Sequence, residues 1–314
     1  MLFTTHSLGG EIVVHLLRLA SNPGYNHSLL PGVRLLRANA ALERTPVLYE
    51  PCIVFVCQGR KRGFLGDAVF VYDARHYLVL SVPLPFASQT EASADEPMLA
   101  ISMKLDFKLL AEVMLTLSRQ KPAGYAAPAS MVSTPIDEAL SEAILRLVKI
   151  LGSALDCQVL GEGIIKEIYY RVLLGEQGEA LRAALDNQGH FGQIARAMQK
   201  IQQQFAARID VTELAANAGM SIPAFHAHFK AVTQSTPMQY LKSTRLHQAR
   251  LLMVRSGLSA AEVAIRVGYE SPSQFSREFK RLFSRSPRQE AVRMRDLLQV
   301  KAALAWPDYI TLEE

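Results

Sequence analysis

The last third of the chain repeats itself at an offset of 50 residues, and this repeat limits the fold more than any other feature. The matching residues are Phe225 with Phe275, Phe229 with Phe279, Lys230 with Lys280, Pro237 with Pro287 and Ser221 with Ser271. With one residue of slack, Gly219 also matches Gly268. Each copy reads as a short apolar helix, a glycine turn, a serine that caps the next helix, and a second helix.

The turn chemistry of each copy is that of a helix-turn-helix unit. In the first copy, Gly219 ends a compact helix with a positive φ, and Ser221 caps the helix that follows. Phe225 and Phe229 are spaced i, i+4 and anchor that helix to a core. A further helix over 237–253 joins the copies. The alternative is a helical bundle that contains two similar hairpins.

Positive charge is concentrated in the same region. Residues 191–298 contain 16 Lys and Arg against 7 Asp and Glu, a net charge of +9, whereas the whole chain carries +5. Such a basic segment is typical of nucleic-acid binding, although a solvated basic face would give the same count. Charge and repeat together favour DNA binding.

The first third of the chain has the pattern of β-strands. Apolar, β-branched runs at 47–57, 68–72 and 77–82 are separated by glycines, Asp67 and Pro83. Short strands with closely spaced turns predict an antiparallel sheet or a small barrel. Helices are expected at 11–20, 104–118, 136–151 and 163–174, with Thr134 and Pro135 beginning the third of them and Asp137 in its first turn.

A polar segment, 176–190, lies where the charge changes sign; it contains Gly178 and Gly189 and directly follows Gly175. We expect this segment to be a linker between a first domain over 1–175 and a helical domain over 191–298, which a tail over 299–314 follows.

Composition excludes several other classes of protein. Three cysteines in 314 residues do not make a disulfide framework and favour a reducing cytoplasm. The N-terminus lacks the pattern of a signal peptide, and no uncharged apolar run reaches about 18 residues. We therefore expect a cytoplasmic protein without a membrane partner.

Residues 191–298 resemble the DNA-binding domain of the AraC/XylS family, which has two helix-turn-helix units in one chain. The resemblance is carried by LAANAGMS, FHAHFK, TPMQYLKSTRLHQARLL, VAIRVGYESPSQFSREFKRLF and SPR. Residues 1–175 resemble a cupin-like N-terminal domain in one branch of that family, through LLPGVRLLR, YEPCIVFVCQGRKR, GDAVFVYDARHYLVLSVPLP and SADEPMLAISMKLD.

The resemblance implies an α+β chain, with a cupin-like β-barrel and flanking helices followed by an all-α domain with two helix-turn-helix units. It also implies a sequence-specific transcription regulator, more often an activator than a repressor. Two departures stand out. The family usually has glycine at the positions of Gln234 and Ser284, and its first recognition helix often carries arginine at the position of Ala227.

The second helix of each unit is expected to enter the major groove of DNA. Its outward positions are Pro223, Ala224, His226 and Ala227 in the first unit, and Ser273, Gln274, Ser276 and Arg277 in the second. Arg277 is the best candidate for a bidentate contact to guanine, and Gln274 could read adenine. The alternatives are an ion pair of Arg277 with Glu278 or Glu270, and solvent or phosphate contacts for Gln274 and His226.

Phosphate contacts would fix the position of the domain on DNA without reading sequence. The candidates are Lys230, Lys280, Arg281, Arg245, Arg250 and Arg288. Arg245 and Arg250 lie on the joining helix, so an ion pair inside the domain is the alternative for either of them.

The first domain is expected, from the resemblance, to bind a small-molecule effector, to form a homodimer, or both. No residue pattern names the effector. His76 has no H-x-H partner, and Cys52 and Cys57 are five residues apart, so we expect neither a metal site nor a cofactor. Gln58 and the basic residues at 60–62 would form an exposed turn or receive an anionic effector.

The expected partners are double-stranded promoter DNA and RNA polymerase, with an effector and a second copy of the chain left open. Two alternatives are a cupin-like enzyme with a DNA-binding appendage and an architectural DNA-binding protein without an effector. No hydrolase or nucleotide-binding motif supports the enzyme.

Overall fold

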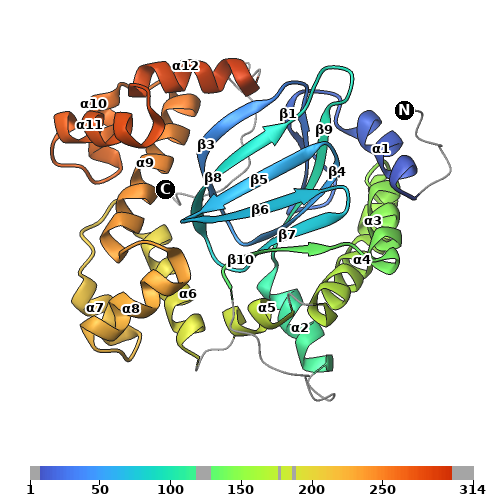
Figure 1. Cartoon of the computed structure of the whole chain (residues 1–314), viewed down its shortest axis with the longest axis horizontal. Coiled ribbons are helices and arrows are strands. Elements are labelled where there is room, and N and C mark those ends of the chain that lie inside the picture. The colour runs from blue at the N-terminus through green and yellow to red at the C-terminus, as the bar shows by residue number, and fades with distance from the viewer. Residues whose placement is uncertain (1–7, 118–128, 176–177, 186–188, 299–314) are drawn as a thin grey trace. The chain divides into compact units, whose positions relative to one another are not determined.

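The computed structural model describes residues 8–117, 129–175, 178–185 and 189–298 (Figure 1). The described residues fall into two compact units. The first lies within 1–44, 51–81 and 88–187, and the second within 45–50, 82–87 and 188–314. The sheets come first and the second unit's helices follow, so the α+β class is confirmed.

Two sheets form the centre of the β-rich part. The larger sheet has the order β1-β2-β9-β4-β7-β10, and the smaller has the order β3-β8-β5-β6. The strands are β1 Gly24–His27, β2 Val33–Ala38, β3 Leu42–Tyr49, β4 Cys52–Gln58, β5 Arg60–Leu65, β6 Ala68–Asp73, β7 His76–Leu80, β8 Leu84–Glu91, β9 Met98–Lys104 and β10 Met131–Pro135. The pairs of the larger sheet are antiparallel, as is the β5–β6 hairpin.

Helices cover the outer face of the larger sheet. They are α1 Leu8–Leu19, α2 Phe107–Leu117, α3 Glu138–Ile150, α4 Ala154–Leu174 and α5 Gly178–Leu185. Ile53 and Phe55 of β4 share one hydrophobic core with Leu16 of α1, Ile144 of α3 and Ile168 of α4. Figure 1 shows α1, α3 and α4 side by side along this face.

The smaller sheet turns a partly polar face inward. Burial alternates strictly along β8, where Leu84, Phe86, Ser88 and Thr90 are buried. Strand β5 adds Lys61 to the buried side chains, although its neighbours Arg60 and Arg62 are more accessible. Burying a lysine costs free energy unless its amine finds polar partners.

Two sequence predictions in this unit are wrong in detail. The run 47–57 is not one strand, because it breaks at Pro51 and its two parts belong to different sheets. Thr134 and Pro135 end strand β10 instead of beginning a helix. The helix α3 begins after Asp137, whose carboxylate accepts a hydrogen bond from the Leu140 backbone N–H at 2.7 Å. Proline is tolerated on β10 because it is an edge strand.

One further helix differs from its predicted bounds, and another lies where no helix was predicted. Helix α4 begins at Ala154, well before residue 163, and Ser153 caps it. The glycines inside it weaken the helical signal, and Gly161 packs so closely on Leu30 that a Cβ there would require the Leu30 side chain to shift. Helix α5 lies inside 176–190, the segment predicted as a linker, and its Leu181 is part of the first unit's core.

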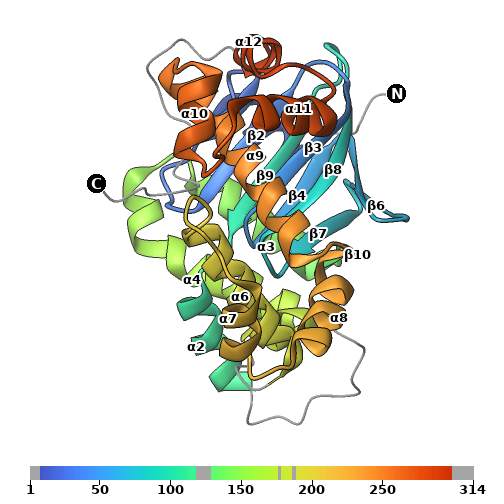
Figure 2. The ribbon, with the colours of Figure 1, turned by 90° about the vertical axis from the view of Figure 1, so that its left-hand side faces the viewer.

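The second unit is helical apart from two short strand segments. Its helices are α6 His190–Gln203, α7 Val211–Asn217, α8 Ile222–Thr233, α9 Pro237–Ser256, α10 Ala260–Arg266, α11 Pro272–Phe283 and α12 Pro287–Leu298. Helices α7 and α8 form one helix-turn-helix pair, and α10 and α11 form the other. Figure 2 shows α9 running from one pair to the other.

Candidate nucleic-acid interface

Both helix-turn-helix turns are made by glycine, as the sequence predicted. Gly219 has a φ of +63° and Gly268 a φ of +86°. A side chain at Gly268 would also lie 2.4 Å from the Ala206 carbonyl oxygen. After each turn a serine caps the recognition helix: Ser221 accepts from the Ala224 backbone N–H at 3.4 Å, and Ser271 accepts from that of Gln274 at 3.3 Å.

Phenylalanine pairs hold both recognition helices to the core. Phe225 and Phe229 of α8 are fully buried, with ring centroids 5.6 Å apart. Phe275 and Phe279 of α11 are equally buried, at 5.5 Å. Because these rings face inward, the opposite side of each helix is presented to solvent.

The repeat also includes the turn that follows each recognition helix. Gln234 and Ser284, which stand where the family usually has glycine, both adopt left-handed backbone, with φ of +56° and +60°. The turn geometry is therefore kept although the glycines are missing. Gln239 and Gln289 then close matching N-terminal caps with Thr236 and Ser286.

The base-reading candidates of the second unit lie on the outward face of α11. Ser273, Gln274 and Arg277 are exposed, and Ser276 is half-buried. Within the described residues Arg277 makes no ion pair, so the structure shows neither of the pairings with Glu270 or Glu278 weighed from the sequence. Its guanidinium group is available to a ligand.

The carboxylate of Glu278 is engaged by three other donors. It accepts from Lys242 Nζ at 3.0 Å, Tyr269 Oη at 2.8 Å and Gln274 Nε2 at 3.2 Å. Burial acts to raise the pKa of this carboxyl, but the three hydrogen bonds outweigh it and hold the pKa below its ordinary value. Glu278 is therefore ionised and orients the Gln274 amide with its nitrogen toward the protein.

The candidates of the first unit lie on α8. Pro223 and Ala227 are exposed, whereas Ala224 and His226 are half-buried. The neighbouring His228 stacks on His190 of α6, with ring centroids 4.3 Å apart. This face therefore offers little hydrogen-bonding capacity compared with α11.

Four of the six phosphate candidates are exposed cations. Lys230, Lys280, Arg281 and Arg288 are all exposed, and none has an ion pair in the described part of the chain. Their positions on or directly after the recognition helices suit contacts to a DNA backbone.

The other two candidates are used inside the fold. Arg245 donates to the carbonyl oxygens of Phe205, Ala207 and Gly268 at 2.7, 2.9 and 2.9 Å. The Arg250 side chain is 8% exposed and lies 3.5 Å from the buried Glu290 carboxylate. We therefore remove both from the set of phosphate contacts, because their guanidinium groups already hold helices together.

Arg295 of α12 was not predicted as a functional residue, and like Arg245 of α9 it donates to backbone carbonyl oxygens of another segment. It donates to the carbonyl oxygens of Met253 and Val254, at the C-terminal end of α9. Arg245 and Arg295 are 50 residues apart, so the offset of the repeat was the signal that could have found it.

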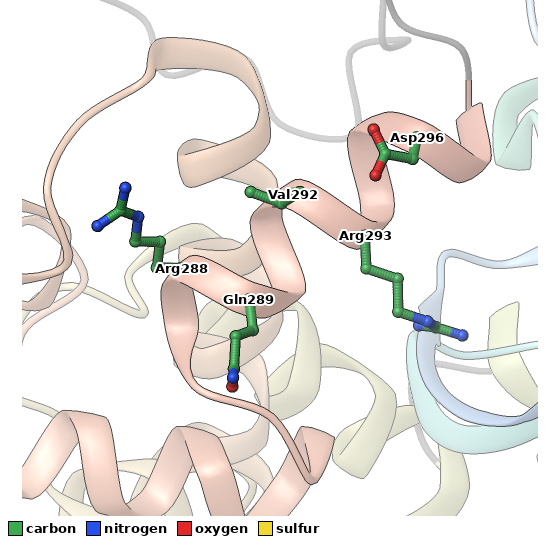
Figure 3. Close-up of a pocket in the computed structure, with 5 residues that line it drawn as sticks. All are labelled: Arg288, Gln289, Val292, Arg293 and Asp296. Atoms are coloured by element: carbon green, nitrogen blue, oxygen red, sulfur yellow. The ribbon is translucent and has the colours of Figure 1, made fainter.

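A surface pocket on α12 does not bring these cations together. Its lining residues are Arg288, Gln289, Val292, Arg293 and Asp296. Figure 3 shows that the side chains of Arg288 and Arg293 point in opposite directions. We assign no ligand to this pocket.

In the first unit the buried Lys61 stands out. It is 5% exposed, and its Nζ donates to Thr90 Oγ1 at 2.9 Å. Burial lowers the pKa of this amine to about 8. Tyr72 and Ser88, with oxygens 3.4 Å apart, add further buried hydroxyl groups to the smaller sheet. Residues 60–62, which were predicted to form a basic exposed turn, begin strand β5 instead, and one of their three cations is buried.

The other candidates of the first unit are engaged or buried. His76 pairs with Asp73 at 3.0 Å. Cys52 is buried, and burial raises the pKa of the Cys57 thiol to about 12. Across the described ranges no group of three or more His, Cys, Asp and Glu residues could hold a metal ion. No described helix is both long and apolar enough to cross a bilayer.

Comparison with known families adds two matches. Residues 29–180 match the model of an AraC-type transcriptional regulator N-terminus, and residues 214–291 match a helix-turn-helix domain. Together these ranges include most of the described chain.

Among similar proteins are activators called RhaS. The chain is 28% identical to the HTH-type transcriptional activator RhaS of Klebsiella pneumoniae over 182 residues, which are 58% of this chain and 63% of that protein. It is 32% identical to RhaS of Yersinia pestis over 112 residues, 36% of this chain and 40% of that protein. The match thus spans less than two thirds of the length of these relatives.

Among solved structures, ToxT from Vibrio cholerae has a similar fold. One form gives a TM-score of 0.55 at 12% identity and covers 83% of this chain and 97% of ToxT. A form with bound unsaturated fatty acid gives 0.53 at 12% identity, over 86% and 97% of the two chains. A third form holds a naphthalenyl butenoic acid.

Proposed function

The chain belongs to the AraC/XylS family of transcriptional regulators, and we propose on this premise that it binds DNA sequence-specifically and regulates transcription. The observation that supports this most directly is the pair of recognition helices in one chain, each capped by serine and anchored by two buried phenylalanines. Two different helices on one chain predict an asymmetric site that spans two successive major grooves.

Within this proposal, the second unit reads bases and exposed cations contact phosphates. Arg277 is unpaired in the described structure and suits guanine, whose O6 and N7 accept two hydrogen bonds. Lys230, Lys280, Arg281 and Arg288 neutralise phosphates. RhaS proteins are named activators, so we propose activation by contact with RNA polymerase.

The experiment compares two substitutions on one helix. The full chain is used to select binding sites from random DNA, and selection is repeated with Arg277→Ala and with Lys280→Ala. We expect Arg277→Ala to relax preference at one or two base pairs, each worth about 1–3 kcal/mol. Lys280→Ala should weaken binding to all sequences equally. It should also make the fall of affinity with salt concentration less steep, by the amount expected for the loss of about one phosphate contact. If both variants lose the same affinity for every sequence, Arg277 contacts a phosphate and not a base.

A genome-wide binding map separates a regulator from an architectural protein. A regulator should occupy few sites, whereas an architectural protein should occupy many. The enzyme alternative has no support from the matched family, which is one of transcriptional regulators. A regulator of bacterial promoters would work in the cytoplasm, where the DNA is.

We further propose that the first unit responds to a small acidic effector. The ToxT structures hold an unsaturated fatty acid and a butenoic acid, both of which carry a carboxylate. Lys61 is a buried amine with a hydroxyl neighbour and without an ion pair among the described residues, so an acid could neutralise it. Oleate should raise the melting temperature of the parent but not of Lys61→Met. Equal shifts in both proteins would exclude Lys61 from the effector site.

Finally, we propose that α4 forms the interface of a homodimer. Five large apolar side chains on this helix are more than two fifths exposed: Leu155, Val159, Leu160, Tyr170 and Leu174. Leu155 with Val159 and Tyr170 with Leu174 form two i, i+4 pairs, which a second copy could cover on either side of the Glu162–Lys166 ion pair. Val159→Glu should convert a dimer to a monomer in analytical ultracentrifugation, and Gln158→Glu, on an adjacent exposed position, should not. A monomeric parent chain would refute the proposal.

A further inference from the structure

The two recognition helices have the same geometry but opposite chemistry at equivalent positions. At the 50-residue offset, Ala224 aligns with Gln274 and Ala227 aligns with Arg277. Both helices begin at a serine cap and are held by the same pair of buried phenylalanines, so equivalent side chains face the same way. The second unit thus has two hydrogen-bonding side chains where the first has two methyl groups.

The apolar character extends to the start of α8. Ile222, the first residue of α8, is 43% exposed. Pro223 is exposed beside it. Their equivalents on α11 are Pro272 and Ser273. Four neighbouring positions of the first helix therefore present only carbon to solvent.

The first helix nevertheless keeps the means to lie on DNA. Lys230, the equivalent of Lys280, is exposed and unpaired within the described residues. The two histidines on α8 face neighbours: His228 stacks on His190, and His226 lies edge-on to the Phe225 ring. The helix therefore has a phosphate anchor beside an apolar face.

We infer that the first recognition helix reads thymine methyl groups through Ile222, Pro223, Ala224 and Ala227, whereas the second reads bases by hydrogen bonds. In the major groove the thymine C5 methyl is the one apolar group at a base edge, and it marks A·T pairs without any hydrogen bond. The inference rests on the proposed DNA-binding function and deepens it.

The recognition helix of the second unit carries side chains that can hydrogen-bond to base edges. The side-chain amide nitrogen of Gln274 donates to the Glu278 carboxylate at 3.2 Å. The amide oxygen therefore remains to accept a hydrogen bond from an adenine or cytosine amino group. Arg277 supplies donors for guanine. The binding site should therefore have a thymine-rich half under the first unit and a half that contains guanine under the second.

The test removes methyl groups from the DNA and nothing else. Full-length protein is used to select its site, and thymines are then replaced by deoxyuridine in one half at a time. Each methyl group lost from the first half should weaken binding about fourfold, the equivalent of one buried carbon. Replacement in the second half or in flanking DNA should change affinity by less than about twofold.

A protein variant tests the same inference from the other side. Ala227→Arg restores the equivalent of Arg277 and should shift the preference of the first half toward guanine, with reduced sensitivity to deoxyuridine. Unchanged affinity on deoxyuridine in the first half of a selected site would overturn the inference and leave the proposed function standing. Failure to select any preferred sequence would overturn both.

Discussion

Replacing Ser284 by glycine should stabilise the protein. Ser284 has a φ of +60° at the end of α11, a left-handed conformation that costs a residue with a Cβ about 1–2 kcal/mol. Glycine removes this cost but loses about 0.5–1 kcal/mol through the greater freedom of the unfolded chain. The expected gain is therefore about 0.5–1 kcal/mol, which corresponds to a rise of about 2–6 °C in the melting temperature of a domain of this size.

The repeat provides a matched second position. Gln234 has a φ of +56°, but its amide also donates to the Ala231 carbonyl oxygen at 3.3 Å, and glycine would lose that bond. Gln234→Gly should therefore stabilise by less than Ser284→Gly. Calorimetry of the full chain measures both, with Ser284→Ala as the control that keeps the Cβ and its strain. If Ser284→Gly melts no higher than Ser284→Ala, the left-handed backbone is not the source of the cost.

Two other predictions concern buried cations. Burial lowers the pKa of Lys61 to about 8, so the unfolded chain binds more protons between pH 8 and 10.5, and stability should rise over that window by up to about 3 kcal/mol. Lys61→Met should abolish this part of the rise and be the more stable protein at pH 7, and parallel melting curves in the two proteins from pH 7 to 10.5 would contradict this. Arg245→Ala should cost about 3–5 kcal/mol, because three carbonyl oxygens lose a charged donor, and Arg295→Ala should cost less because two do. Equal melting temperatures of the two arginine variants would refute the difference.

The helical part of the fold was predictable because its signals are local. Gly219 and Gly268 mark turns that need a positive φ, and Ser221 and Ser271 mark the starts of the recognition helices. These residues act within a few positions of themselves. A repeat also provides a second sample of each signal, which separates a pattern from coincidence.

The β-rich part was harder to predict because sheet partners are distant in sequence. Strand β4 pairs with β9, more than 40 residues away, and nothing local in 47–57 shows that its two halves enter different sheets. Thr134 and Pro135 fit a helix start as well as a strand end, and pairing with β7 decides between them. Helix α4 contains two glycines that weaken its helical signal, and packing against Leu30 accounts for only one of them, Gly161.

For the candidate site, the sequence identified which helices face outward but not which cations are already used. From the sequence, Arg245 and Lys230 are both cations in a basic domain, and either could contact a phosphate. The structure separates them, because three carbonyl oxygens surround the first and none in the described chain accepts from the second. Such carbonyls belong to helix ends and turns that are remote in sequence, so spacing cannot reveal them.

If the protein binds DNA as proposed, the length of α9 limits the spacing of the sites that it can use. A helix of 20 residues is about 30 Å long, close to the 34–36 Å of one turn of B-DNA, and it cannot stretch like a flexible tether. Arg245, in the middle of this helix, ties it to the backbone at Phe205 and Gly268, and Arg295 of α12 bonds to its C-terminal end. The helix therefore fixes the distance between the two helix-turn-helix pairs. Promoters should tolerate a changed base far better than one inserted base pair, which would turn the second half of the site by about 35° away from its reader.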